Sequence, residues 1–265
     1  VSWSRRRSKK KQVNLLGCNV PQKETDDIRA VLQQAGYELG VLSACRDYAE
    51  FEEMAKAELN LVISPVVLAA TKKMEKKLGI PWLRHLRSYR LDEIDEMYAE
   101  LSKQLNTDLT EAAAEFRKKA EEKIRETLAV IGDYPVAVDY QAVLRPFNLA
   151  LALAEYGFKV GMVASNGIPA FEKESAKKLK EMVPDIVFTD PMHPQSVQYP
   201  HEGEEYLCIG FDCGYITKSK KLVELVEDEG LFGYSGVMEL MNRMQDAFLT
   251  KADVNKMIEG AGLII

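Results

Sequence analysis

Four cysteines and three histidines are the side chains of this sequence that could hold a metal or act as nucleophiles. Cys18 and Cys45 each follow an expected strand, Cys208 lies within one, and Cys213 comes shortly after it. No C-x-x-C pair occurs, so the spacing does not predict a zinc ribbon or a ferredoxin-type cluster. We expect most of these cysteines to be small buried side chains. Cys208 and Cys213 are the better functional candidates, because both fall near an expected ligand-binding cleft.

The histidines show no paired ligand spacing. His193, in the stretch DPMHP after an expected strand, is the best placed of the three, and we expect a structural role for it. His201 begins HEGEE, which is not the H-E-x-x-H of a zinc protease and is expected to be a solvated loop. The nucleotide-binding patterns G-x-G-x-x-G and G-x-x-x-x-G-K-[ST] and the hydrolase pattern G-x-S-x-G are also missing.

Arg145 is the most informative charged residue. It lies in QAVLRPF, between an expected strand and the helix after it. A guanidinium there would project beside the free amides of a helix N-terminus, an arrangement that suits an anion or an anionic cofactor. The alternative is a surface arginine that caps a neighbouring loop.

The elements that position these residues follow from the hydrophobic pattern. Short apolar runs alternate with helical patterns twice along the chain, which predicts parallel sheets covered by helices. The stretches QQAGYELGVLSA and AEYGFKVGMVAS mark the two halves as an internal repeat. The fold class is therefore α/β, with two Rossmann-like parallel-sheet lobes joined by a long helical segment. The expected parts are a basic tail or linker (1–12), the first lobe (13–90), connecting helices (91–131), the second lobe (132–215) and a C-terminal helical segment packed on a lobe (216–265).

Ligands of open parallel sheets bind beyond the carboxyl ends of the strands. The candidate positions are therefore the residues that follow strands, at 18–21, 44–46, 64–65, 141–145, 166–167, 190–193 and 211–215.

Composition excludes several classes of protein. The net charge is −6, which disfavours nucleic-acid binding. No apolar stretch is long enough for a membrane span, and four cysteines in 265 residues do not form a disulfide scaffold, so we expect a cytoplasmic protein. The chain begins with Val rather than Met, and we expect it to be a piece of a longer polypeptide.

Four stretches in this order resemble the nitrogenase component 1 family of oxidoreductases, which includes nitrogenase molybdenum–iron protein subunits, cofactor-assembly scaffolds and dark-operative protochlorophyllide reductase subunits. The stretches are LNLVISPVVLAATKKMEKKLGIPWL, the charged helical segment after it, VAVDYQAVLRPFNLALALAEYGFKVGMVAS, and CIGFDCGY with FGYSGVMELMNRMQDAF. The resemblance covers about residues 12–250.

The resemblance implies a third, N-terminal domain that carries most of the cysteines of an iron–sulfur cluster. This chain alone is then expected to bind no cofactor and to be inactive. The complete protein is expected to contain an iron–sulfur cluster, to accept electrons from an ATP-driven iron–sulfur reductase, and to form a homo- or heterodimer with a related subunit, without nucleic acid or membrane as partner.

The departures from the family matter as well. Ser64 stands where the nitrogenase catalytic subunit has a cysteine that binds its cofactor, and no His occurs near 207–214, where the family's His ligand is expected. Arg145 matches an arginine close to that cofactor. The resemblance therefore argues against dinitrogen reduction. It implies that Ser64, Arg145 and Cys208 line one cleft between the lobes, with Cys18 and Cys213 at its rim.

Two other classes stay open. Two Rossmann-like lobes joined by a long helix also describe exported binding proteins for metals, siderophores and corrinoids. An upstream signal peptide would favour that class, and an upstream cysteine-rich domain would favour the oxidoreductase. Other two-lobed enzymes, such as glycosyltransferases or epimerases, would be expected to show acid/base carboxylates at strand ends, which are not evident in the sequence.

Overall fold

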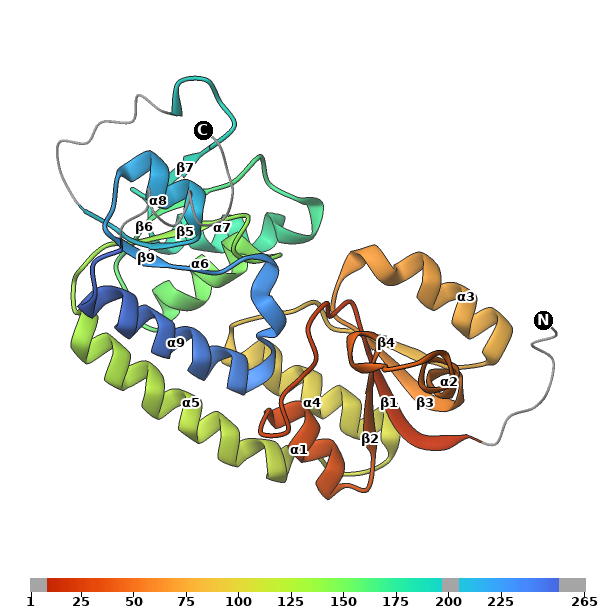
Figure 1. The fold of residues 1–265 in the computed structure, drawn as a ribbon. Helices are drawn as coiled ribbons and strands as arrows, with labels where there is room; N and C mark the ends of the chain where they lie inside the picture. The colour runs from red at the N-terminus through yellow and green to blue at the C-terminus, as the bar shows by residue number, and fades with distance from the viewer. Residues whose placement is uncertain (1–8, 197–204, 253–265) are drawn as a thin grey trace. The chain divides into compact units, whose positions relative to one another are not determined.

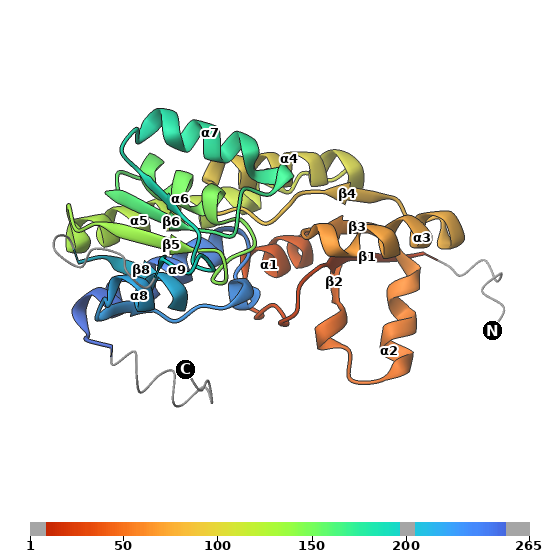
Figure 2. The same cartoon turned by 90° about the horizontal axis from the view of Figure 1, so that it is seen from above.

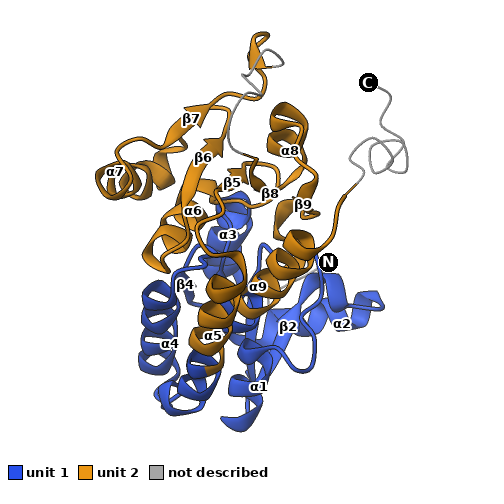
Figure 3. Ribbon diagram, turned by 90° about the vertical axis from the view of Figure 1, so that its left-hand side faces the viewer, with its two compact units in different colours: residues 1–118, 232–236 blue, residues 119–231, 237–265 orange. Residues whose placement is uncertain are grey.

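The computed structural model describes residues 9–196 and 205–252. The chain divides into two compact units (Figure 3). Unit 1 consists of Val1–Lys118 with Phe232–Gly236, and unit 2 of Lys119–Leu231 with Val237–Ile265. Each unit is built around its own parallel sheet, so the prediction of an α/β fold with two parallel sheets is confirmed. The expected domain bounds themselves stay a prediction.

Unit 1 contains a four-stranded sheet in the order β2-β1-β3-β4, with every neighbouring pair parallel. Its strands are β1 (Lys10–Leu16), β2 (Glu38–Val41), β3 (Ala57–Val62) and β4 (Trp82–Arg84). Its helices are α1 (Asp27–Gln34), α2 (Tyr48–Glu53), α3 (Leu68–Leu78), α4 (Leu91–Leu105) and the first part of α5 (Thr110–Ile131). Figures 1 and 2 show α1 and α4 on one side of this sheet and α2 and α3 on the other.

The centre of this sheet buries a polar pair among apolar side chains. Asn14 on β1 and Asn60 on β3 are register partners, and both are fully buried. The Asn14 amide donates to Asn60 Oδ1 at 2.8 Å and to the Met54 carbonyl at 2.9 Å. Because buried polar groups are costly unless they are hydrogen-bonded, this pair favours one register of β1 against β3.

Unit 2 contains a five-stranded parallel sheet in the order β7-β6-β5-β8-β9. Its strands are β5 (Val136–Asp139), β6 (Val160–Ala164), β7 (Val187–Thr189), β8 (Leu207–Ile209) and β9 (Lys221–Val223). Its helices are α6 (Pro146–Glu155), α7 (Lys173–Met182), α8 (Phe211–Thr217), the rest of α5 and most of α9 (Gly233–Leu249). Helix α6 is apolar nearly all round, and residues 146–153 are all buried.

Several elements differ from the sequence-based expectation. Strand β9 and helix α8 were not predicted, and β1 begins at Lys10, inside the expected basic tail. The last three residues of that tail are strand because Lys10 and Gln12 pair with β2 and β3. His201 and residues 253–265 of the expected C-terminal helical segment lie outside the described residues.

Across residues 9–196 and 205–252, no helix is both long enough and apolar enough to cross a membrane.

Candidate functional site

The carboxyl ends of β1 and β3 meet closely in unit 1. Gly17 follows β1 with a φ of +98°, and a Cβ added there would lie 2.6 Å from Ser64 Cβ. Only glycine allows this approach, because a side chain at Gly17 would be both strained and overlapping. The structure therefore places Ser64 against the residue that precedes Cys18, so these two predicted site residues lie at one strand-end region.

Cys18 has polar neighbours that the sequence analysis did not single out. Its sulfur accepts from Gln22 Nε2 at 3.2 Å and lies 3.6 Å from Arg87 Nη2, while the thiol donates to the Val20 carbonyl at 3.0 Å. Cys18, Gln22 and Arg87 are all buried. The Arg87 guanidinium is thus a buried positive charge close to the Cys18 sulfur. Arg87 follows β4, so extending the strand-end rule to that strand would have found it.

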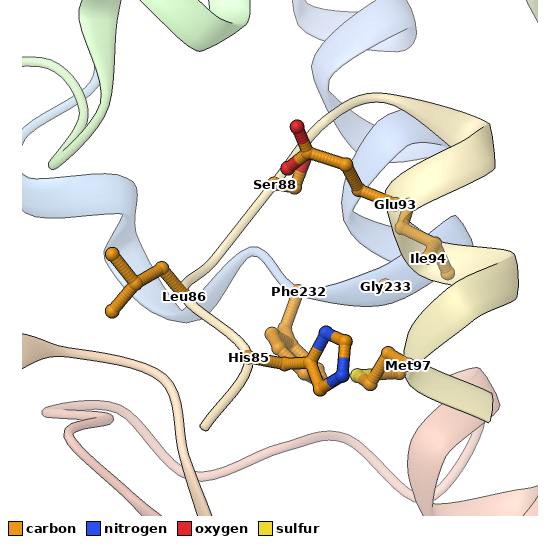
Figure 4. A pocket seen from close by; sticks show the side chains of 8 residues that line it. All are labelled: His85, Leu86, Ser88, Glu93, Ile94, Met97, Phe232 and Gly233. Atoms are coloured by element: carbon orange, nitrogen blue, oxygen red, sulfur yellow. The ribbon is translucent and has the colours of Figure 1, made fainter. Parts of the chain in front are cut away.

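A second feature of unit 1 is a cavity of only about 10 Å³. Figure 4 shows the side chains around it. A space of this size holds one water molecule at most. His85, which faces it, binds Glu100 through Nε2 at 2.8 Å. The cavity is therefore too small for a substrate. Its lining residues are His85, Leu86, Ser88, Glu93, Ile94, Met97, Phe232 and Gly233.

In unit 2, two carboxylates lie at the ends of the neighbouring strands β5 and β8. Asp139 is fully buried and accepts the Gln141 N–H at 2.9 Å and the Cys213 N–H at 3.0 Å. The Gln141 side chain donates to Asp212 Oδ2 at 3.0 Å. Burial raises the pKa of Asp139 to about 6, with a further contribution from the Asp212 charge. Burial also raises the pKa of Asp212. Acid/base carboxylates at strand ends are thus present, although no sequence pattern indicated them.

Arg145 lies at the N-terminus of α6, as expected, and it is 9% exposed. An internal carboxylate already binds the amides of this helix end. Glu172 is fully buried and accepts the N–H groups of Phe147 at 3.2 Å and Asn148 at 2.9 Å. Arg145 Nε lies 4.0 Å from Glu172 Oε1. The anion that suits this helix end is therefore a residue of the chain itself, and it comes from a segment that sequence spacing does not connect to Arg145.

The loop before Arg145 is held by a strained turn. Glu227, Asp228 and Glu229 have φ values of 46°, 62° and 43°, a left-handed conformation that costs each non-glycine residue about 1–3 kcal/mol. The Asp228 N–H donates to the Ala142 carbonyl at 2.8 Å, and Asp228 Oδ2 accepts the Leu144 N–H at 3.0 Å. The turn thereby fixes the path of residues 141–144 between β5 and α6.

Cys208 and Cys213 lie in the core of unit 2, and both are fully buried. They pack with Ala137, Met162, Ala164, Tyr206 and Leu222. Burial raises the pKa of Cys213 well above its usual value, and the Cys208 thiol and the Asp139 carboxylate add to that shift. Cys213 is thus a protonated, enclosed thiol at neutral pH. That Arg145, Cys208 and Cys213 contact a cofactor together with Ser64 stays a prediction, since these residues belong to different units from Ser64 and Cys18.

The described residues can also be tested for an iron–sulfur site. Within residues 9–196 and 205–252, no group of three or more His, Cys, Asp or Glu side chains could hold a metal ion. All four cysteines lie in these ranges as free thiols, with Cys18 and Cys45 in unit 1 and Cys208 and Cys213 in unit 2. This arrangement does not fit an iron–sulfur cluster, which takes several cysteine ligands at one place.

Comparison with known families decides the affiliation of the chain. The model of the family described as "Nitrogenase component 1 type Oxidoreductase" matches residues 2–249. The chain belongs to this family. The resemblance that the LRP turn and the accompanying stretches suggested is thereby confirmed.

Solved structures agree with the nitrogenase component 1 fold. One, "Nitrogenase Cp1 at pH 6.5", has a TM-score of 0.66 at 14% identity and covers 91% of this chain and 60% of its own. Another, "Nitrogenase Cp1 at pH 5", has a TM-score of 0.61 at 17% identity and covers 95% and 58%. The siderophore binding protein BauB has a TM-score of 0.46 at 10% identity, with 90% and 92% covered.

The chain thus spans about three fifths of the length of the nitrogenase structures that it matches. No curated protein matches the sequence.

Proposed function

We propose that this chain is part of a nitrogenase-like oxidoreductase component. The complete protein accepts electrons from an ATP-driven iron–sulfur reductase and transfers them to a substrate or cofactor held at the strand ends. The single observation that carries the proposal is the family match over residues 2–249. The four free cysteine thiols suit the reducing cytoplasm in which such a protein would work.

The strand-end region of unit 1 supports a role in that reaction. Ser64 packs there against Gly17, the residue before Cys18, and Arg87 supplies a positive charge beside the Cys18 sulfur. In this role Gln22 orients the Cys18 sulfur through its side-chain amide. Because the described residues do not fit a cluster, the iron–sulfur centre belongs to the part of the complete protein outside this chain.

The proposal excludes dinitrogen reduction for the complete protein. Ser64 presents a hydroxyl at the position that the resemblance matches to a cofactor-binding cysteine. A hydroxyl is a much weaker ligand for soft metal clusters than a thiolate. We therefore propose a different substrate, or a role in cofactor assembly, together with a related subunit as dimer partner.

The test uses the complete gene product that contains this chain and the ATP-dependent iron–sulfur reductase of the same organism. The reductase is reduced with dithionite, freed of excess dithionite, and mixed anaerobically with the protein and MgATP. We expect its visible spectrum to change to that of the oxidised form only when both the protein and hydrolysable ATP are present. Oxidation that does not depend on ATP, or no oxidation at all, would overturn the proposal.

A matched pair of variants tests the strand-end region in the same assay. Cys18→Ala should slow ATP-dependent oxidation of the reductase at least tenfold, whereas Cys45→Ala should leave the rate unchanged. Both variants should melt within a few degrees of the wild type. Equal rates for the two variants would remove Cys18 from the site while leaving the family assignment intact.

A further inference from the structure

An apolar cavity of about 360 Å³ lies within unit 1, between the end of β1 and the helices α2 and α3. Its lining is almost entirely hydrocarbon, and the polar side chains are confined to Cys18, Asn19 and Glu52. The full set of lining residues is Leu15, Leu16, Gly17, Cys18, Asn19, Leu42, Phe51, Glu52, Met54, Ala55, Val67, Ala70, Met74 and Leu78. The cavity borders the proposed strand-end site at Gly17 and Cys18, and its other lining residues have no part in the proposed electron transfer.

The helix wall of the cavity packs only partly against the sheet, where Met74 Sδ lies 4.0 Å from Asn60 Nδ2 of β3. Ala70, Met74 and Leu78 recur at the spacing of one face of α3, and Val67 lies just before that helix, yet Thr71 is the single buried residue of α3. On the other wall, Phe51 is 40% exposed and Leu42 is 56% exposed. An apolar helix face normally closes on its sheet, because burial of apolar surface stabilises the fold by about 25 cal/mol per Å². Here α3 and the side of the cavity that carries Leu42 and Phe51 leave a space between them.

The size and lining of the space indicate its occupant. Ligand pockets have volumes of about 300–1,000 Å³, and a cavity of roughly 150 Å³ already takes up benzene. Because walls stand on two sides, the space is a slot for a small molecule rather than a flat face for a partner protein. Glu52 on its lining disfavours anions.

We propose that this cavity binds an uncharged, mainly apolar small molecule about the size of a bicyclic aromatic compound or a medium-length alkyl chain. Its apolar body lies between Phe51 on α2 and Met74 on α3, and a polar end, where one is present, lies beside Asn19. The proposal goes beyond the electron-transfer function and does not depend on it.

The neutral dye N-phenyl-1-naphthylamine, which fluoresces strongly in apolar surroundings, tests the proposal on this chain. We expect saturable binding of one dye per chain. Ala70→Phe fills the cavity from α3 and should weaken dye binding at least tenfold. Ala69→Phe makes the same change at the neighbouring position on α3, which is exposed like Ala70 but does not line the cavity, so this variant should bind the dye like the wild type.

Two further measurements keep the result decisive. Ala55→Phe fills the cavity from the α2 side and should also abolish dye binding, so the test survives if one filled variant does not fold. Both filled variants should melt at or above the wild-type temperature, because they close an internal gap. Dye binding that persists in the filled variants would overturn the proposal. Sedimentation that shows a second copy of the chain covering the cavity would overturn it as well.

Discussion

Glu172 shows how a residue far away in sequence can take the place of an outside ligand. Its buried carboxylate accepts two amides at the start of α6 and lies beside Arg145. A helix N-terminus and an arginine attract an anion wherever it comes from. In this chain the anion comes from the turn before α7, so the charge of Arg145 is compensated internally.

We predict that Glu172→Ala destabilises the protein by about 3 kcal/mol, because it leaves the α6 amides and the Arg145 guanidinium without a buried carboxylate. The control is Glu174→Ala, which removes an exposed carboxylate on α7 that pairs with Lys178 at 3.9 Å and should cost less than about 0.5 kcal/mol. Urea unfolding measures both. Equal midpoints for the two variants would show that the internal ion pair contributes nothing to stability.

Asp139 leads to a prediction about pH. Its pKa of about 6 in the folded protein lies above the value of about 3.9 for an unfolded chain, so the folded state binds this proton more tightly. The stabilisation that Asp139 gains from this proton is therefore fully present below pH 4. It is lost from the free energy of unfolding as the pH rises from about 4 to 6. Two pKa units correspond to roughly 3 kcal/mol. Urea unfolding across this pH range should show a shallower decline for Asp139→Asn than for the wild type, and identical slopes would contradict the prediction.

At the scale of elements, the long periodic segments were predictable and the short ones were not. The helical spacing of six apolar residues within 91–105 predicts one buried face for α4, and all six are buried: Leu91, Ile94, Met97, Tyr98, Leu101 and Leu105. Helix α8 contains a glycine and a threonine and begins after Gly210, and β9 has only three residues in a lysine-rich stretch. Such short elements are stabilised by their neighbours in the sheet rather than by local preference, so periodicity cannot reveal them.

The same distinction holds for the candidate site. Cys18 and Ser64 follow strands, as the strand-end rule predicts, and their role in a site stays a prediction. Arg87, Gln22 and Glu172 are brought in by loops whose paths depend on packing. The spacing of residues along the sequence does not predict those contacts.

The start of α9 is anchored to α1 by a buried carboxylate. Asp27 accepts the N–H groups of Tyr234 at 3.0 Å and Ser235 at 3.1 Å and the hydroxyl of Tyr98 at 2.8 Å. The Asp27 N–H donates in turn to Ser235 Oγ at 2.9 Å. Gly233, with a φ of +63°, makes this possible, since a Cβ there would lie 2.3 Å from Asp27 Oδ2.

We predict that Gly233→Ala costs about 3 kcal/mol or more, because it adds a clash with the Asp27 carboxylate to the backbone strain. Gly79→Ala is a matched control, with a φ of +67° and no atom within 4 Å of the added Cβ. It should cost only the left-handed backbone, about 1–2 kcal/mol. Thermal melting compares the two variants. An equal decrease in melting temperature would show that the Asp27 carboxylate moves away from the added methyl group at no energetic cost.

At the scale of the whole molecule, the chain is a family member that spans about 60% of the nitrogenase structure it matches. Its two units each have a complete parallel sheet with a buried core. We therefore expect each unit to fold around its own core, and the proposed electron transfer, which is a property of the complete protein, stays a proposal for this chain.

The distribution of cysteines makes that dependence measurable. Cys208 and Cys213 are enclosed in the core of unit 2, whereas Cys18 and Cys45 belong to unit 1 and lie in different surroundings there, Cys18 near Arg87 and Cys45 near Met54. A cluster needs several thiolates at one place, and Cys213 is held protonated by burial.

Anaerobic reconstitution of this chain with ferrous iron and sulfide should therefore leave less than one tenth of an equivalent of iron after desalting, with no visible absorption. The complete protein, treated in the same way, should retain stoichiometric iron. A strongly absorbing, stoichiometric cluster on these 265 residues would mean that the thiols of one unit rearrange to meet, and it would contradict the assignment of the cluster to the remainder of the protein.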